Sequence, residues 1–155
     1  MSLTEQGSSA QGSSAQGSSA QGGSAQGSSA RRLAGEEVVR EMLGADFLHR
    51  SMAGPADGPP GPGADLARLA LEQCYGDIWT RPGLDRRSRS LITLGILMAQ
   101  GRPAELRNHV RGALGNGLTP EEILEATLHS APYVGLPAAG QAFATATETL
   151  KEPGH

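Results

Sequence analysis

The sequence predicts an all-α protein, folded as a single compact domain of about six helices. In segment after segment, apolar residues recur at the spacing of one helix face. Residues that begin and end helices stand at the boundaries of these segments, and no segment alternates with the period of two that a half-buried strand shows. A chain of 155 residues is long enough for one such domain.

The first 30 residues are predicted to be a disordered tail outside this domain. Five tandem copies of QGSSA run over residues 6–30, the fourth reading QGGSA, and they contain no charge and no residue larger than Gln. Such a segment cannot bury enough apolar surface to offset the entropy of ordering it. The folded domain is therefore expected to cover residues 31–155.

The first helix is predicted within LAGEEVVREMLGADFLHR, where five apolar residues at helical spacing form the inner face: Val38, Val39, Met42, Leu43 and Phe47. The stretch AGPADGPPGPGAD that begins at Ala53 is rich in proline and glycine and predicts an exposed loop. A second helix follows in ADLARLALEQCYGDIW. Its predicted inner face consists of Leu66, Leu69, Ala70, Tyr75 and Ile78.

The third helix is predicted to begin after Asp85, a suitable N-cap, and to cover RRSRSLITLGILMAQ. It is apolar almost all round from Leu91 to Met98, a pattern typical of a helix covered by the domain or by a subunit partner. The fourth helix lies in GRPAELRNHVRGALGNG and is expected to end near Gly115 and Gly117.

Two further helices complete the prediction. Thr119, Pro120 and Glu122 form a strong start signal for the fifth, as N-cap, first helical residue and capping-box partner, and it is expected to end near Ser130. Pro132 and Gly135 then interrupt the chain. The sixth helix begins at Pro137, and its inner face carries Ala139, Phe143, Ala146 and Leu150.

Composition excludes several classes of function. One cysteine, Cys74, excludes an internal disulfide, a CxxC redox pair and a thiolate zinc site. A net charge of −3 and five aromatic residues (one Trp, two Tyr, two Phe) argue against nucleic-acid binding. A helix-turn-helix around GNGLT would turn Glu121, Glu122 and Glu125 toward phosphates. With no signal peptide and no apolar run of ~18 residues, we expect a soluble cytoplasmic protein that does not bind membranes.

The fourth helix carries the residues best suited to proton transfer. Glu105 and His109 are one turn apart, on a stripe with Gly112 and Asn116 beside the apolar face. A carboxylate at this spacing can hydrogen-bond the imidazole and fix its tautomer. Gly112 leaves room for a ligand or for another helix. The alternative is an ordinary Glu–His pair on a solvent-facing helix.

Arginines crowd the start of the third helix, where the helix macrodipole favours acids instead. Arg86, Arg87 and Arg89 lie in its first turn, and Arg81 lies just upstream. Guanidinium groups beside free backbone N–H donors predict a site for a carboxylate or phosphate. The alternative is that they form ion pairs with Asp or Glu of another helix or subunit.

The remaining candidates are Tyr133, His129, Trp79 and Cys74. Tyr133 belongs to a rigid turn with Gly135 and Pro137, whereas His129, near a helix C-terminus, is expected to be structural. Trp79 is expected in the core or a pocket. Cys74 has no second cysteine, so we expect a small buried apolar residue.

These motifs together resemble the carboxymuconolactone decarboxylase family. The resemblance covers about residues 65–150 and rests on W-x-R-P-G-L, R-S-L, G-R-x-x-E-L-R-x-H and Y-x-G-x-P-A. It implies an all-helical, alkylhydroperoxidase D-like fold that assembles as a homo-oligomer, a trimer or a hexamer. Alkylhydroperoxidase-like members use a CxxC pair, but Arg102 and Glu105 stand at those positions here, which excludes a dithiol peroxidase.

The resemblance implies loss of CO2 from 4-carboxymuconolactone, giving 3-oxoadipate enol-lactone in the protocatechuate branch of the β-ketoadipate pathway. No cofactor or metal is needed, because the electrons move onto the lactone carbonyl. His109, held by Glu105, becomes the proton donor or the partner of the oxyanion. Arg86 or Arg89, with Arg81 in reserve, binds the retained carboxylate of this dicarboxylate lactone. Trp79, Leu91 and Tyr133 supply apolar walls.

Two other hypotheses stay open at this stage. The chain could act on another lactone or on a β-keto acid, because a fold does not determine its substrate. It could also be a helical oligomerisation module without activity, in which Glu105 and the arginines form only ion pairs between subunits.

Overall fold

The computed structural model describes residues 18–152 and their side chains from residue 25 onward. This part of the chain is helical without a single strand, which confirms the all-α prediction for one domain. The elements are the α-helices α1 (Ser18–Leu43), α2 (Ala45–Phe47), α3 (Gly54–Ala56), α4 (Pro62–Leu69), α5 (Arg86–Gln100), α6 (Pro103–Gly115), α7 (Pro120–Val134) and α8 (Leu136–Leu150), and the wider π-helices η1 (Leu48–Ala53) and η2 (Ala70–Ile78).

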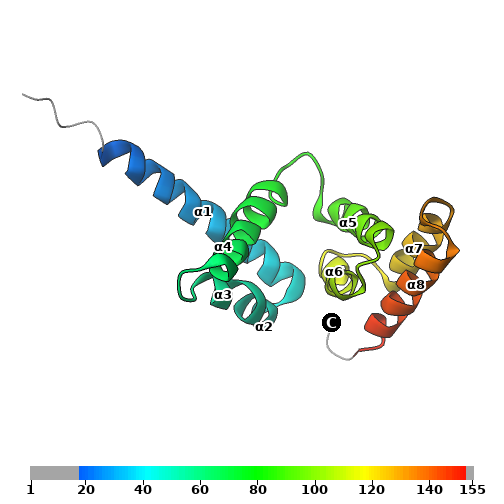
Figure 1. Cartoon of the computed structure of the whole chain (residues 1–155). Helices are drawn as coiled ribbons and strands as arrows, with labels where there is room; N and C mark the ends of the chain where they lie inside the picture. The colour runs from blue at the N-terminus through cyan, green and yellow to red at the C-terminus, as the bar shows by residue number, and fades with distance from the viewer. Residues whose placement is uncertain (1–17, 153–155) are drawn as a thin grey trace, which may run out of the picture.

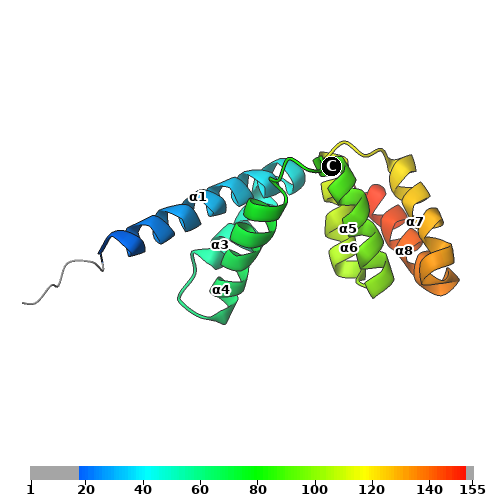
Figure 2. The ribbon, with the colours of Figure 1, turned by 90° about the horizontal axis from the view of Figure 1, so that it is seen from above.

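The helices form two groups that meet where the end of α1 reaches α6 (Figures 1 and 2). The first group contains α1 to α4 with η1 and η2, and the second contains α5 to α8. Each group has its own apolar cluster of buried side chains. The first cluster contains Val38, Val39, Met42, Leu48, Ala56, Ala67, Leu71, Tyr75 and Trp79. The second contains Leu94, Met98, Leu106, Val110, Ala113, Leu118, Ile123, Ala142 and Ala146.

Two glycines allow α1 and η2 to pack with their backbones in contact. A Cβ atom on Gly35 would lie 2.0 Å from the carbonyl oxygen of Leu71. A Cβ atom on Gly76 would lie 2.2 Å from the carbonyl oxygen of Arg31. Only a residue without a side chain fits at either position, so this pair of glycines sets the distance between the two helices.

Glycines also allow the close contact that joins the two groups of helices. A Cβ atom on Gly112 of α6 would lie 2.6 Å from Cε of Met42, and one on Gly115 would lie 2.4 Å from the carbonyl oxygen of Met42. The space at Gly112, predicted for a ligand or for another helix, is therefore filled by the end of α1. This contact fixes the helix that carries His109 against the first group.

The start of the chain differs from the prediction in two ways. Helix α1 begins at Ser18, inside the repeats that were expected to be disordered, while residues 1–17 lie outside the described residues. Ala and Gln are good helix formers, and an existing helix extends at far lower cost than a new one forms. The single helix predicted to run past residue 44 is wrong, because Gly44 adopts φ 88° and ends α1 there.

The segment predicted as a long loop is mostly helical. Of the stretch from Ala53 to Asp65, only residues 57–61 form turns and bends. Pro62 occupies the first turn of α4, where a helix needs no N–H donor, and Pro55 stands in α3, which continues the helical backbone of η1. The prediction failed because it treated both prolines as helix breakers.

The predicted inner face of the second helix is also wrong in part. Tyr75 is buried as expected, but the exposed fractions of Leu66, Leu69 and Ile78 are 70%, 47% and 52%. The buried positions are instead Ala64, Ala67 and Leu71. Small side chains face inward where α4 packs against α3 and η1, and the wider turns of η2 rotate the later residues away from the predicted face.

Most predicted helix ends are confirmed. The Asp85 carboxylate accepts a 2.6 Å hydrogen bond from the backbone N–H of Ser88, and Thr119 and Glu122 form both bonds of a capping box. The predicted end of the fifth helix near Ser130 is wrong, because α7 continues through Pro132 to Val134. Pro132 removes the bond to the carbonyl of Leu128, which lies at an exposed position where water can replace it.

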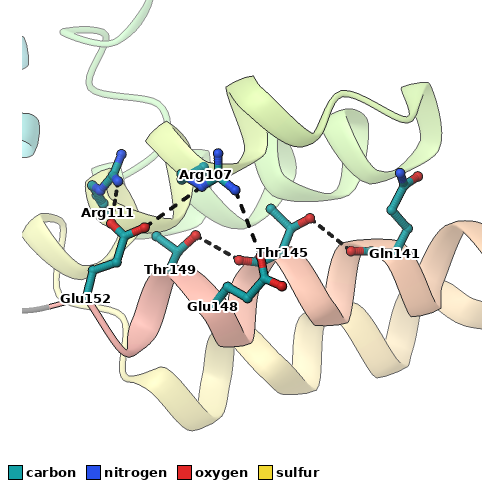
Figure 3. Close-up of polar contacts among 7 residues, drawn as sticks. All are labelled: Arg107, Arg111, Gln141, Thr145, Glu148, Thr149 and Glu152. Carbon is teal, nitrogen blue, oxygen red and sulfur yellow. Dashed lines mark hydrogen bonds and ion pairs between the residues drawn. The ribbon is translucent and has the colours of Figure 1, made fainter.

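Polar contacts hold α6 against α8 (Figure 3). Arg107 lies 4.0 Å from the carboxylates of Glu148 and of Glu152, and Arg111 donates to Glu152. Arg107 and Arg111 flank His109 by two residues on either side, roughly half a turn around the helix. The contacts therefore restrain the rotation of α6 without occupying the face on which His109 lies.

Candidate active site

The structure places His109 at the junction of the two helix groups. Its imidazole ring is half-buried and stacks on the indole of Trp79, with 6.4 Å between ring centroids and 28° between ring planes. Trp79 follows the last residue of η2 and is 6% exposed. Tyr75, one turn earlier on η2, packs against the same indole, with 5.9 Å between ring centroids. The three rings form a continuous row that runs from the first core to α6.

Burial lowers the pKa of His109 below its ordinary value of 6.5, because a poorly solvated site disfavours the imidazolium cation. No charged group contributes to this shift among the described residues. At neutral pH the ring is therefore a neutral imidazole with one N–H donor. Such a ring can donate a hydrogen bond to a developing negative charge.

Glu105 shares the stripe but does not contact His109. Its side chain is exposed, and no hydrogen bond joins the two residues within residues 18–152. The predicted restraint of the imidazole by Glu105 is therefore absent from this structure. Asn116, at the end of the stripe, donates a 3.0 Å hydrogen bond to the buried Ser90 of α5.

The arginines near the start of α5 are largely engaged by the protein itself. Arg86 donates to Glu41 of α1, and Arg87 donates to Glu122 of α7. The alternative reading of these arginines, ion pairs with another helix, thus describes both residues. Each guanidinium is thus already paired with a carboxylate of another helix.

Arg89 has a local role in the same region. Its guanidinium donates to the carbonyl oxygens of Arg81, at 2.8 Å, and Leu84, at 3.2 Å. These bonds tie the turn between η2 and α5 to the first turn of α5. The exposed side chain of Arg81 has no ion-pair partner among the residues described, and it lies two residues beyond Trp79. Of the three predicted carboxylate ligands, Arg81 is the one whose side chain has no hydrogen bond or ion pair among the described residues.

Leu91 and Tyr133, also predicted for the site, lie on α5 and α7 and not on the helix of His109. Tyr133 is 77% exposed, and its ring contacts that of His129 on the same helix, with 5.5 Å between centroids and 47° between ring planes. His129 lines an open groove of about 500 Å³ between α5 and α7, which Leu91 also lines. Cys74, expected to be buried, is exposed.

The prediction missed Tyr75 as a support of the site and placed it only in the core. The available signal was its spacing from Trp79, because aromatic residues at i and i+4 lie on one helix face and can stack. The contact of His109 with Trp79 could not be found this way, since His109 lies 30 residues further along the chain.

Comparison with known proteins identifies the family of the chain. Residues 64–148, which include Trp79, Arg81, Glu105 and His109, match the model of the carboxymuconolactone decarboxylase family. The chain belongs to the carboxymuconolactone decarboxylase family. The resemblance inferred from the sequence motifs is thereby confirmed.

Two relatives extend over most of the chain. A 4-carboxymuconolactone decarboxylase of Acinetobacter baylyi is 39% identical over 120 residues, which cover 77% of this chain and 87% of the relative. A nitrosuccinic acid decarboxylase of Metarhizium robertsii is 39% identical over 124 residues, covering 79% and 84%. Both relatives are named as decarboxylases, so this member of the carboxymuconolactone decarboxylase family is a carboxy-lyase, as predicted.

Two kinds of feature are absent from the described part of this family member: a membrane-spanning helix and a cluster of metal ligands. None of the helices in residues 18–152 is both long enough and apolar enough to cross a membrane. The same residues hold no cluster of three or more His, Cys, Asp or Glu arranged to bind a metal ion.

Proposed function

We propose that the protein decarboxylates 4-carboxymuconolactone to 3-oxoadipate enol-lactone without a cofactor, as a cytoplasmic enzyme of the protocatechuate branch of the β-ketoadipate pathway. The observation that carries the proposal is the half-buried, neutral His109 stacked on Trp79 within the segment that matches the family. The 4-carboxymuconolactone decarboxylase of Acinetobacter baylyi, which is similar to 77% of this chain, supports this choice of substrate.

The reaction needs little beyond a site for negative charge. As the bond to the carboxylate breaks, CO2 leaves, and the electron pair moves through the ring double bond onto the lactone carbonyl oxygen. A proton then adds to the ring carbon and gives the enol-lactone. The protein must stabilise the dienolate oxygen and supply that proton.

His109 is better suited to the first task than to the second. A neutral imidazole donates its N–H to an oxyanion without transferring the proton, and its low proton affinity keeps the imidazolium form scarce at neutral pH. Glu105, one turn earlier and exposed, is in reach of solvent protons and is the candidate for delivering the proton to carbon. The two residues then act on different atoms of the substrate, which agrees with their lack of a mutual hydrogen bond.

Arg81 is the proposed ligand of the retained carboxylate. It follows Trp79 by two residues, and its guanidinium has no carboxylate partner in the described part of the chain. Arg86 and Arg89 are committed to Glu41 and to backbone carbonyls. A planar guanidinium binds a carboxylate through two hydrogen bonds and so orients the ring of the substrate.

A second candidate substrate is nitrosuccinic acid, because the relative named for that decarboxylation is as similar to this chain as the first. Its nitro group plays the part of the lactone carbonyl, accepting the electron pair as CO2 leaves. The demands on His109 and Arg81 are the same, since a second carboxylate is retained. Another lactone or a β-keto acid would fit the same scheme.

We further propose that the enzyme is a homo-oligomer, a trimer or a hexamer. Helix α5 buries Leu94 and Met98, but Ile92 and Ile96 are 51% and 50% exposed on its outer side. A second subunit that covers these side chains would account for the apolar character of α5 on all sides.

The test is an ultraviolet assay of both substrates with the wild-type protein, His109→Gln and His109→Ala. A Gln amide keeps an N–H donor, so a donor to the oxyanion should lose about a hundredfold in kcat in the Ala variant and distinctly less in the Gln variant. Equal losses in both variants would instead assign His109 as the general acid. A folded wild-type protein that turns over neither substrate would overturn both choices and point to another lactone or a β-keto acid.

A further inference from the structure

We infer that Trp79 is a positioning residue of the decarboxylation: its buried indole stacks on His109 and fixes the orientation in which the imidazole meets the substrate. This inference rests on the proposed function of His109. It differs from the role expected for Trp79 from the sequence, which was that of a wall in contact with the substrate. At 6% exposure the indole is enclosed by protein and has little surface left for a ligand.

The need for a positioning residue follows from the surroundings of His109. A reactive imidazole is usually oriented by a carboxylate or carbonyl that accepts a hydrogen bond from its second nitrogen. Within residues 18–152, His109 has no side-chain hydrogen bond of this kind, and Glu105 points to solvent. The ring of Trp79, nearly parallel at 28° and 6.4 Å between centroids, is the contact that defines the plane of the imidazole.

Trp79 is itself held in place. Tyr75 packs against the indole at 5.9 Å and 39°, and both rings belong to the first apolar cluster. Tyr75 is 6% exposed, so the row is anchored in the core and not at the surface. The close contact of α1 with η2 at Gly35 and Gly76 keeps η2, and with it Trp79, at a fixed distance.

The charged groups on the neighbouring elements α1, η2 and α5 have other partners and do not orient the imidazole of His109. On α1, Glu41 pairs with Arg86, and on η2 Asp77 lies 3.9 Å from Arg31. On α5, Arg89 binds backbone carbonyls. Attraction between an imidazolium and the indole is weak as well, because such contacts need about 6 Å or less from the ring centroid. Trp79 therefore acts by excluding water and by fixing the ring plane.

The test compares Trp79→Leu with Trp79→Phe, using Tyr75→Phe as a control that keeps both rings. We expect Trp79→Leu to lower kcat by about tenfold to a hundredfold, as misplaced catalytic groups do, and Trp79→Phe to recover most of the activity. An NMR titration of the imidazole, assigned with His109→Gln, should show the pKa of His109 moving up toward its ordinary value in Trp79→Leu only. Unchanged titration or unchanged kcat in that variant would overturn the inference.

A second measurement needs no change in the core. Trp79 is the one tryptophan of the chain, so its fluorescence can be followed without interference. A stacked imidazolium quenches an indole, and the fluorescence of the wild-type protein should fall as His109 becomes protonated but stay level in His109→Gln. A level signal in the wild type would overturn the stacking, even if Trp79→Leu failed to fold.

Failure of this inference and failure of the proposed function give different results. Decarboxylation that depends on His109 but is insensitive to Trp79→Leu would remove the role of Trp79 and retain the function. A wild-type protein without decarboxylase activity would overturn both, even if the titration and the fluorescence showed the two rings to be coupled.

Discussion

Replacing Gly35 by Ala should destabilise the protein, although Ala is the better helix former. In the middle of α1 the exchange by itself would favour folding by about 1 kcal/mol. The new Cβ atom, however, would lie 2.0 Å from the carbonyl oxygen of Leu71, 2.9 Å from its carbonyl carbon and 3.0 Å from the backbone nitrogen of Gly76. All three are backbone atoms, so no side chain can rotate to make room.

The size of the effect follows from the distance that α1 must move. Ordinary contact begins at 3.4 Å, so α1 and η2 must separate by about 1.4 Å along this direction. Overpacking in a well-packed core costs about 1–3 kcal/mol, and a rigid backbone contact belongs at or above the upper end of that range. After subtraction of the helix propensity, we expect a net loss of about 2 kcal/mol, which corresponds to roughly 4–8 °C in Tm.

The assay is urea unfolding followed by far-ultraviolet circular dichroism at one protein concentration, with Gly27→Ala as the matched control. Gly27 lies in the same helix, and a Cβ atom there would have nothing within 4 Å. That variant should be unchanged or gain at most about 1 kcal/mol. If Gly35→Ala were stabilised as much as Gly27→Ala, the account of the α1–η2 contact would be refuted.

Four further outcomes are expected. Because burial lowers the folded-state pKa of His109, the unfolded chain binds more protons at mildly acidic pH, so the free energy of unfolding should rise as pH increases up to about 6.5, and denaturation at several pH values should show a smaller rise in His109→Gln. Thr119→Ala should cost about 1 kcal/mol in thermal unfolding through loss of the capping box of α7, whereas Thr119→Ser should retain most of it. A double-mutant cycle on Arg111 and Glu152, which form a partly exposed pair, should give less than about 1 kcal/mol. Arg81→Gln should raise the KM for the substrate by about tenfold or more, while Arg87→Gln, already paired with Glu122, should leave it nearly unchanged.

Helix boundaries were the most predictable part of the fold, because their signals are local. Asp85 and Thr119 cap α5 and α7 as predicted, since each acts on backbone groups three residues away. The same reasoning failed at Pro132 and at Gly44. A proline inside a helix is tolerated where water reaches the freed carbonyl, and a glycine ends a helix only if the following chain turns away.

The sequence predicted which residues belong to the candidate site but not how they are arranged. His109 and Trp79 were both named from sequence motifs, but nothing in their spacing predicts that their rings stack. Glu105 was paired with His109 on helical spacing alone, which places two side chains on one stripe but does not decide whether either turns to solvent. For His109, the contact with Trp79 decides that the side chain turns inward.

By itself the sequence determined the all-α class, most helix ends, the family and the residue types available for catalysis. These depend on capping, periodicity and motifs within short stretches of chain. The tertiary structure alone decided which faces are buried, which arginines are free and what His109 touches. Those outcomes depend on contacts between distant segments, such as Gly35 with Leu71 and Trp79 with His109, where the fit of one surface to another sets the energy.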